Sequence, residues 1–149
     1  MTSNAERSDI LARALRAGIE GDQATIREVC TEDVHTWTPA IATSTLTDLL
    51  AKLELRDQGF SDFSLEIFAL DVLGEFACAE WSVSMTHSGP LEISGGRHIE
   101  PTGLRVTLNG ASVAEFRGPR ICSLRQYWDE LGVYEQLGLV EEDKRVAGD

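Results

Sequence analysis

The sequence predicts an α+β fold in which a curled, antiparallel β-sheet wraps around helices that come first in the chain. Three observations support this prediction. Apolar residues recur at helical spacing in the first third of the sequence, and long β-rich runs fill most of the rest. The length of 149 residues, 42% of them hydrophobic, suits one domain that can bury a core. Helices followed by a meander of strands are typical of an α+β domain whose sheet encloses a space.

Helical periodicity marks three segments near the start of the chain. In order, with the short strand that follows the second helix, they are a helix at residues 5–20, a helix capped by Asp22, a strand at 33–38, and a helix whose apolar face carries Leu46, Leu49, Leu50 and Leu53. The strand ends at Pro39, which cannot donate a ladder hydrogen bond. The helical pattern breaks at residues 57–62.

The remaining elements are β-rich runs followed by a terminal helix. In chain order they are strands at 63–72 and 76–87, an irregular loop at 88–102, a hairpin from residue 103 that turns at Gly118-Pro119, and a helix at 131–139. The loop is a candidate lid over a pocket. Residues 1–140 therefore make a single domain, and residues 141–149 make a charged tail.

The charge balance narrows the choice of partners. A formal net charge of −12 opposes binding to nucleic acid and to anionic membrane surfaces, because both rest on clustered Lys and Arg. The N-terminus lacks the basic and apolar regions of a signal peptide, and no apolar run approaches the ~20 residues of a membrane span, so we expect a cytoplasmic protein. Cys30, Cys78 and Cys122 are far apart among apolar neighbours, which predicts small buried side chains rather than disulfides or a zinc site.

Sequence motifs spread over nearly the whole chain resemble those of the SnoaL-like polyketide cyclases. They are Gly21-Asp22, Trp81 with Thr86-His87-Ser88-Gly89, Pro101-Thr102-Gly103-Leu104-Arg105-Val106, and Tyr127-Trp128-Asp129-Glu130-Leu131-Gly132 with Gln136-Leu137-Gly138. The resemblance implies the cone-shaped fold of nuclear transport factor 2, which ketosteroid isomerase and limonene epoxide hydrolase share. It also implies a hydrophobic pocket for a polyketide or a similar ring compound. Residues 92–100 look longer than the family's usual connection, which would reshape the pocket mouth.

The resemblance implies where acid/base chemistry would occur. Cyclases of this kind use a carboxylate to remove a proton beside a carbonyl, and a hydrogen-bond donor to stabilise the enolate. The family places that Asp on the last strand after a Trp, and the matching residues here are Gln126 and Arg125. Gln126 forms hydrogen bonds but does not titrate. An inward position that carries His or an oxyanion-binding Asp in relatives matches Ser112, and a His position on the first strand matches Trp37.

Two other residues are candidates for moving the proton. His87 has an imidazole, the side chain suited to proton exchange near neutral pH, but a His at a strand end is as often a hydrogen-bonded hinge. Asp129 turns away from the side of Gln126 if the strand alternates regularly, and turns inward if a β-bulge reverses the phase. The pattern favours another role for Asp129, which is to cap the terminal helix.

Alternation also predicts the walls of the pocket. Cys122, Leu124 and Trp128 share the face of Gln126 if the strand is regular. Trp37, Trp81 and Trp128 would offer flat faces to a polycyclic ligand, or they fill the core. The three His are scattered and no Gly-rich loop joins a strand to a helix, so we expect neither a metal nor a cofactor.

The function that these features predict is a cofactor-independent cyclase or isomerase of secondary metabolism, such as antibiotic biosynthesis, that acts on a hydrophobic ring substrate. Gln126 and Ser112 would orient the substrate, and His87 or Asp129 would move the proton. One alternative is a protein that binds or templates a hydrophobic metabolite without acid/base chemistry. Another is a relative of hydroxylases or epoxide hydrolases, although the first Asp of the hydrolase Asp-Arg-Asp set falls at Gln126. A homodimer through the convex face of the sheet is left open.

Overall fold

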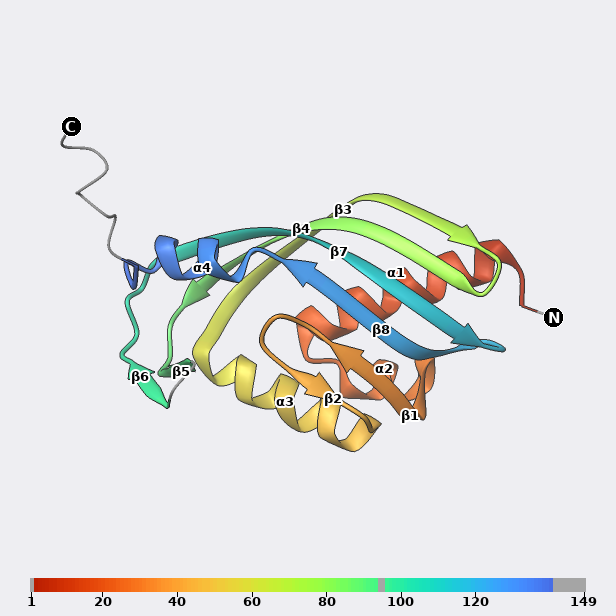
Figure 1. Cartoon of the computed structure of the whole chain (residues 1–149), viewed down its shortest axis with the longest axis horizontal. Helices are drawn as coiled ribbons and strands as arrows, with labels where there is room; N and C mark the ends of the chain where they lie inside the picture. Colours follow the sequence, from red (N-terminus) through yellow and green to blue (C-terminus); the bar gives the residue numbers. More distant parts are fainter. Residues whose placement is uncertain (1, 94–95, 141–149) are drawn as a thin grey trace.

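The computed structural model describes residues 2–93 and 96–140 (Figure 1). Its helices are α1 (Asn4–Glu20), α2 (Gln23–Val29), α3 (Leu46–Gly59) and α4 (Glu130–Gln136). Its strands are β1 (Cys30–Trp37), β2 (Ala42–Thr43), β3 (Phe60–Leu73), β4 (Phe76–His87), β5 (Leu91–Ile93), β6 (Arg97–Ile99), β7 (Arg105–Arg117) and β8 (Arg120–Trp128). The predicted charged tail at 141–149 lies outside the described residues.

The main sheet has six strands in the order β2-β1-β8-β7-β4-β3, and it is curled but unclosed (Figure 1). Every neighbouring pair is antiparallel except β1 and β8, which run parallel. A parallel pair needs a long crossover, and the chain between these two strands supplies one. Helices α1 to α3 contribute side chains to a core on one face of this sheet. The predicted α+β fold is therefore confirmed, with one parallel pair that the sequence did not indicate.

Local signals fix where the helices begin. Ser3 and Glu6 form a capping box before α1, with the Glu6 amide donating to Ser3 Oγ at 3.1 Å. Asp22 caps α2 by accepting a hydrogen bond from the Thr25 amide at 3.1 Å. The Thr25 hydroxyl also donates to this carboxylate and holds the pKa of Asp22 below its ordinary value. Thr45 caps α3 in the same way, as its Ser/Thr-rich start predicts.

The strand predicted from residue 63 begins earlier than expected, because α3 continues to Gly59 and β3 starts directly after it at Phe60. The junction is held by the segment after β4, where the amides of Ser88 and Gly89 both donate to the Gly59 carbonyl at 3.1 Å. The two segments approach so closely that a Cβ on Gly89 would lie 1.8 Å from the carbonyl oxygen of Gln58. Gly89 in the Thr-His-Ser-Gly motif is therefore required for this close approach.

Residues 88–102 are more regular than expected. They contain the antiparallel hairpin of β5 and β6, in which Leu91 pairs with Ile99. Three-residue strands are too short to show alternation in the sequence, which is why the irregular loop was predicted there. In Figure 1 this hairpin extends beyond the end of the main sheet that carries α4.

Two apolar clusters fill the interior. The larger one lies between α1 to α3 and the sheet, and includes Leu11, Val34 and Ile121, which are fully buried. The smaller one lies near α4 and contains Phe60, Met85, Val106, Val133 and Leu137. The expectation of three buried cysteines holds for Cys30 alone, since Cys122 is half-buried and Cys78 is exposed. Cys78 is exposed because its strand neighbours Ala77 and Ala79 take the buried face.

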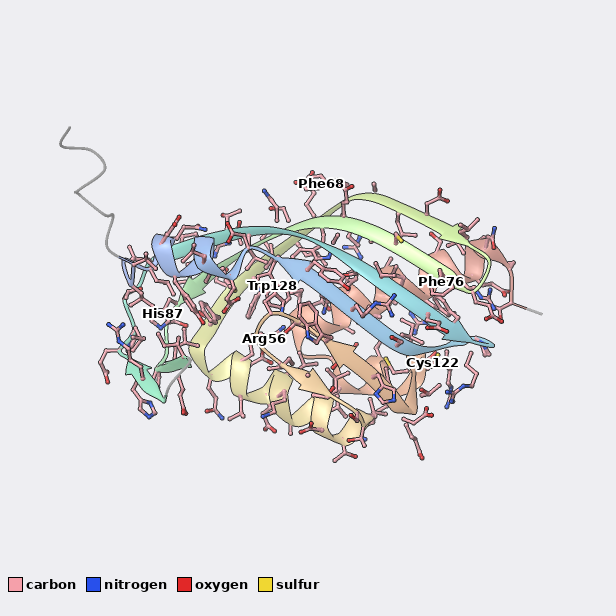
Figure 2. All side chains as sticks on the ribbon, viewed as in Figure 1. Arg56, Phe68, Phe76, His87, Cys122 and Trp128 are labelled. Atoms are coloured by element: carbon pink, nitrogen blue, oxygen red, sulfur yellow. The ribbon has the colours of Figure 1, made fainter. Side chains whose placement is uncertain are left out.

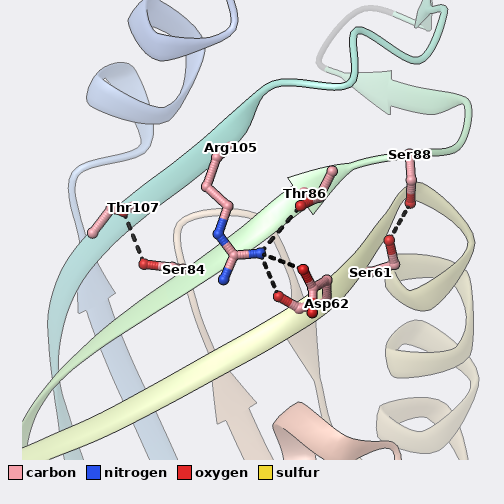
Figure 3. A network of polar contacts seen from close by, with 7 residues as sticks. All are labelled: Ser61, Asp62, Ser84, Thr86, Ser88, Arg105 and Thr107. Carbon is pink, nitrogen blue, oxygen red and sulfur yellow. Dashed lines mark hydrogen bonds and ion pairs between the residues drawn. The ribbon is translucent and has the colours of Figure 1, made fainter.

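The outer face of the sheet carries a polar network near the start of β3 (Figure 3). The Arg105 guanidinium donates to the carbonyl oxygen of Asp62, to its carboxylate at 3.2 Å and to the Thr86 hydroxyl at 3.1 Å. Asp62 has a φ of 57°, and the pairing of β3 with β4 is interrupted at this point by a register shift. The Arg105 of the Pro-Thr-Gly-Leu-Arg motif thus fastens this irregular turn of β3 to β7.

Candidate functional site

Three polar side chains meet on the inner face of the sheet. Trp81 on β4, Ser112 on β7 and Gln126 on β8 come from adjacent strands, and Ser112 lies directly opposite Gln126 in the ladder. Trp81 is 5% exposed, Ser112 is fully buried, and Gln126 is half-buried. Trp81 Nε1 donates to Ser112 Oγ at 2.9 Å, and Ser112 Oγ donates to Gln126 Oε1 at 3.0 Å. The sequence predicted all three residues on one face, and the structure brings them together.

This chain of hydrogen bonds has a fixed direction. An indole N–H only donates, so Ser112 Oγ accepts from Trp81 and passes its own hydrogen to Gln126. The Gln126 oxygen is thereby occupied as an acceptor, which leaves the Nε2 amide as the outward end of the chain. Within the described residues, Gln126 Nε2 forms no hydrogen bond. The site therefore offers an oriented neutral N–H donor to a carbonyl or an enolate oxygen.

Apolar groups surround the polar chain. Trp128, two residues after Gln126, packs against the main core, and its ring lies 6.2 Å from that of Trp81 in an edge-on arrangement. Figure 2 labels Trp128 on the side of β8 that faces α3. Leu124 is 9% exposed on the same side. Leu124, Gln126 and Trp128 thus share one face of β8, as alternation predicts, and Trp81 lies beside Trp128.

Cys122 does not belong to this wall. The register between β7 and β8 shifts after Glu115, so that Glu115 pairs with Ser123 and Phe116 with Ile121. Cys122 is the extra residue of this bulge, and its thiol donates to the Glu115 carbonyl at 3.5 Å. Ile121, which is fully buried, takes the inward place expected for Cys122. The bulge lies before Gln126 and leaves the alternation after it regular.

Asp129 therefore stays out of the wall. Its carboxylate accepts a hydrogen bond from the Gly132 amide at 2.9 Å and caps α4, and the residue is exposed. The helix-capping role that the sequence favoured is the one observed. The next residue, Glu130, was not considered as a site residue on the basis of the sequence. Its carboxylate accepts a hydrogen bond from Trp128 Nε1 at 2.5 Å, and it is half-buried.

His87 lies at the end of β4, near β5 and β6 (Figure 2), and is fully buried. Its Nδ1 accepts a hydrogen bond from the Thr102 amide at 3.2 Å and lies 2.9 Å from the Thr102 hydroxyl. The His87 and Gly103 backbones are also paired, with a 2.9 Å bond from the Gly103 amide to the His87 carbonyl. The geometry matches the hinge role and joins two of the family motifs. His87 Nε2 is buried without a partner in the described residues, and its ring packs against Phe60 at 5.5 Å.

Trp37 lies on the opposite face of the sheet from Gln126. On β1, Val34 and Thr36 point into the core, which leaves Trp37 44% exposed, with its ring tilted against that of Tyr127 at a centroid distance of 5.3 Å. Trp37 borders a hollow of about 330 Å³ whose other lining residues are His35, Thr36, Ala42, Thr43, Ser44, Ser123 and Arg125. A second hollow lies at the start of α2. Neither is lined by Gln126, Ser112 or His87, so the enclosed pocket implied by the resemblance stays a prediction.

Two further properties concern the described part of the chain alone. Across residues 2–93 and 96–140, no cluster of three or more His, Cys, Asp or Glu side chains is arranged to hold a metal ion. In the same residues, no helix is long and apolar enough to cross a membrane.

The family comparison agrees with the fold. A sequence model of the SnoaL-like polyketide cyclases matches residues 9–137, and the chain therefore belongs to this family. No match to a curated protein was found.

Solved structures share the fold at low sequence identity. AclR of Streptomyces galilaeus, described as a candidate hydroxylase, aligns with a TM-score of 0.78 and 21% identity over 97% of this chain and 93% of its own. IdmH of Streptomyces antibioticus, described as a candidate polyketide cyclase, aligns with a TM-score of 0.74 and 21% identity over 89% and 98%. An LEH-like epoxide hydrolase of M. tuberculosis aligns with a TM-score of 0.71 and 16% identity over 92% and 88%. These likenesses establish the fold alone, because one fold can host several chemistries.

Proposed function

We propose that this protein is a cofactor-independent cyclase or isomerase of secondary metabolism, for example in antibiotic biosynthesis, that acts on a polyketide-like or other hydrophobic ring ketone. The observation that carries the proposal is the Trp81–Ser112–Gln126 chain, which ends in a free amide donor beside apolar rings. A ring ketone that packs against Trp128 would present its carbonyl to Gln126 Nε2. Removal of a proton next to that carbonyl would create an enolate, whose charge the amide stabilises.

The proposal also covers the partners, the location and the assembly of the protein. The expected partner is the small-molecule substrate, and the net charge of −12 argues against binding to nucleic acid and to anionic membranes. We place the protein in the cytoplasm. A homodimer is one possible assembly, and size-exclusion chromatography with light scattering distinguishes it from a monomer.

The test uses a β,γ-unsaturated androstenedione, a hydrophobic ring ketone whose isomerisation produces a conjugated enone that absorbs ultraviolet light. Wild-type protein should accelerate the reaction above buffer. Gln126→Ala should lower kcat by about 10²–10³, the usual cost of a lost oxyanion donor. Tyr127→Phe is the matched control, because Tyr127 is the next residue on β8 and faces outward. Equal rates for wild type and Gln126→Ala would reject this role for the amide.

A second candidate function is binding or templating of a hydrophobic metabolite without proton transfer. It is favoured by one observation, namely that the hydrogen-bonded chain contains no group that titrates near neutral pH. Holding reacting atoms together can by itself promote a ring closure. A pH–rate profile separates the two candidates, because templating gives a flat profile and acid/base catalysis gives a limb. An epoxide hydrolase is the weaker option, since Gln126 occupies the position of its first Asp.

A further inference from the structure

Glu130 carries the carboxylate whose burial and position best fit a catalytic group on the inner face of the sheet. Of the Asp and Glu residues that the structure describes, all are exposed except Glu115 and Glu130, which are half-buried. Glu115 lies on the outer face of β7, because its neighbours Ala114 and Phe116 are buried on the inner face. Glu130 is thus the one partly buried carboxylate among the described residues that approaches the inner wall. Its position follows from the chain path, since α4 begins where β8 ends.

Trp128 determines where the Glu130 carboxylate lies. The indole N–H donates to Glu130 Oε2 at 2.5 Å, so the carboxylate is held at the edge of the Trp128 ring. The ring itself faces inward and contacts Trp81. Only one carboxylate oxygen is occupied by this bond. The second oxygen, Oε1, forms no hydrogen bond within the described chain.

Gln126 and Glu130 are therefore both placed beside Trp128. Gln126 precedes Trp128 by two residues on β8, so the two share a face with their Cα atoms about 7 Å apart. Glu130 is the first residue of α4 and is held at Trp128 by the bond from the indole N–H. The geometry points to Glu130 as the general base of this site, with Gln126 as the donor to the developing enolate. This inference rests on the proposed function and supplies the base that Gln126 cannot be.

The proton transfer balances without any other reactant. Glu130 takes a proton from the carbon beside the substrate carbonyl, the C–H electron pair forms a carbon–carbon double bond, and the carbonyl oxygen becomes an enolate held by Gln126 Nε2. In an isomerisation, the protonated Glu130 returns the proton to a more distant carbon of the same system. In a cyclisation, the enolate carbon attacks a second carbonyl of the same molecule, and Glu130 protonates the resulting alkoxide.

No charged neighbour in the described residues is paired with the Glu130 carboxylate. Charged side chains on the segments around it are engaged elsewhere or exposed: Asp129 caps α4, Arg105 pairs with Asp62, Arg117 pairs with Asp33, Arg125 donates to Ser123, and Arg120, Glu80 and Glu135 are exposed. None of the described cations forms an ion pair with Glu130. A pH limb that depends on this residue is therefore a direct readout of its role.

The test compares wild type with Glu130→Gln in the ring-opening elimination of nitrobenzisoxazole. This reaction needs only a base in an apolar site. The base removes the ring C–H as the N–O bond breaks, and the phenolate product absorbs visible light. Wild type should exceed the rate with an equal concentration of acetate and should lose activity on the acid side. Glu130→Gln keeps an acceptor for Trp128 but cannot take a proton, so it should lose about 10²-fold or more in rate and lose the acid limb. Asp129→Asn, which keeps the cap of α4, should behave as wild type.

The two proposals fail in different ways. A wild type no faster than acetate, or a Glu130→Gln variant with an unchanged acid limb, overturns the role of Glu130. Circular dichroism confirms that each variant is folded before its rate is measured. Turnover of nitrobenzisoxazole that depends on Glu130, without turnover of any ring ketone, would reject the proposed function and support Glu130. If the ring ketone is turned over and Glu130→Gln has the same pH–rate profile as wild type, the role of Glu130 as the base is rejected and the proposed function stands.

Discussion

Gly110→Ala tests how tightly the inner wall is packed. An ideal Cβ at this position would lie 2.5 Å from Trp81 Cη2, 2.6 Å from Trp81 Cζ2 and 2.7 Å from the carbonyl oxygen of Tyr127. Trp81 is 5% exposed and is held by its bond to Ser112, and the third neighbour is backbone. Overpacking of this kind costs ~1–3 kcal/mol. Because three atoms must shift and none is the end of a flexible side chain, we expect a loss of ~3 kcal/mol in the free energy of unfolding.

Urea unfolding followed by tryptophan fluorescence and by far-ultraviolet circular dichroism measures this loss. With a denaturant slope of ~1–3 kcal/mol per M, the midpoint should fall by ~1 M or more. The matched control is Gly18→Ala, where a Cβ meets nothing within 4 Å inside α1. That substitution should raise the free energy of unfolding by ~0.5–1 kcal/mol.

A double-mutant cycle isolates the cause. Trp81→Phe removes the indole atoms that the new Cβ would meet, so Gly110→Ala should cost less in that background than in wild type. A Gly110→Ala protein with the urea midpoint of wild type would refute the packing argument. So would a penalty that is the same with and without the indole.

Three further predictions concern single contacts. Ser112→Ala leaves the buried Trp81 indole N–H without its acceptor and should lower the free energy of unfolding by ~1–3 kcal/mol in the same urea assay, whereas no change would mean that the bond contributes nothing. The hydrogen bond from Arg117 holds the pKa of Asp33 below its ordinary value of 3.8, so its stabilisation is present at neutral pH and is lost as the pH falls below 3.8 through the folded-state value. Asp33→Asn should accordingly lower Tm at neutral pH, with a difference that shrinks in acid; a constant difference would contradict this. Burial raises the pKa of Cys30 to about 11, so iodoacetamide at mildly alkaline pH should label the exposed Cys78 and leave Cys30 until urea is added, as peptide mass spectrometry would show.

The amide at position 126 determines what the polar chain on the inner face can do. Where relatives are expected to carry a carboxylate, this chain has an amide whose oxygen is occupied by Ser112. The amide can donate through its unbonded Nε2 but cannot take up a proton near neutral pH, so in the proposal the base comes from a neighbouring segment. Glu130 meets that need in the proposal above, while His87 is engaged through Nδ1 with Thr102. In the proposal, the donor Gln126 lies on a strand and the base Glu130 lies at the start of a helix, so each role can be tested by itself.

The sequence by itself determined the helices, most of the strands and the face shared by Leu124, Gln126 and Trp128, and the family resemblance added Trp81 and Ser112. These predictions succeed because a sheet with one buried face forces side chains to alternate, and the pattern is visible in the residue types. The caps of α2 and α3 were likewise local signals, since the capping residue and its partner are only three positions apart.

Tertiary structure alone decided the features that depend on segments far apart in the chain. The bulge that turns Cys122 out of the wall exists only in the pairing of β8 with β7, and the parallel pairing of β8 with β1 needs the whole intervening chain. Trp37 is on the outer face because the residues around it on β1 fill the core. Glu130 reaches Trp128 because α4 packs near β7 and directs its first side chain back to the sheet. The spacing of residues in the sequence does not predict this contact, because the contact depends on the angle at which α4 leaves β8.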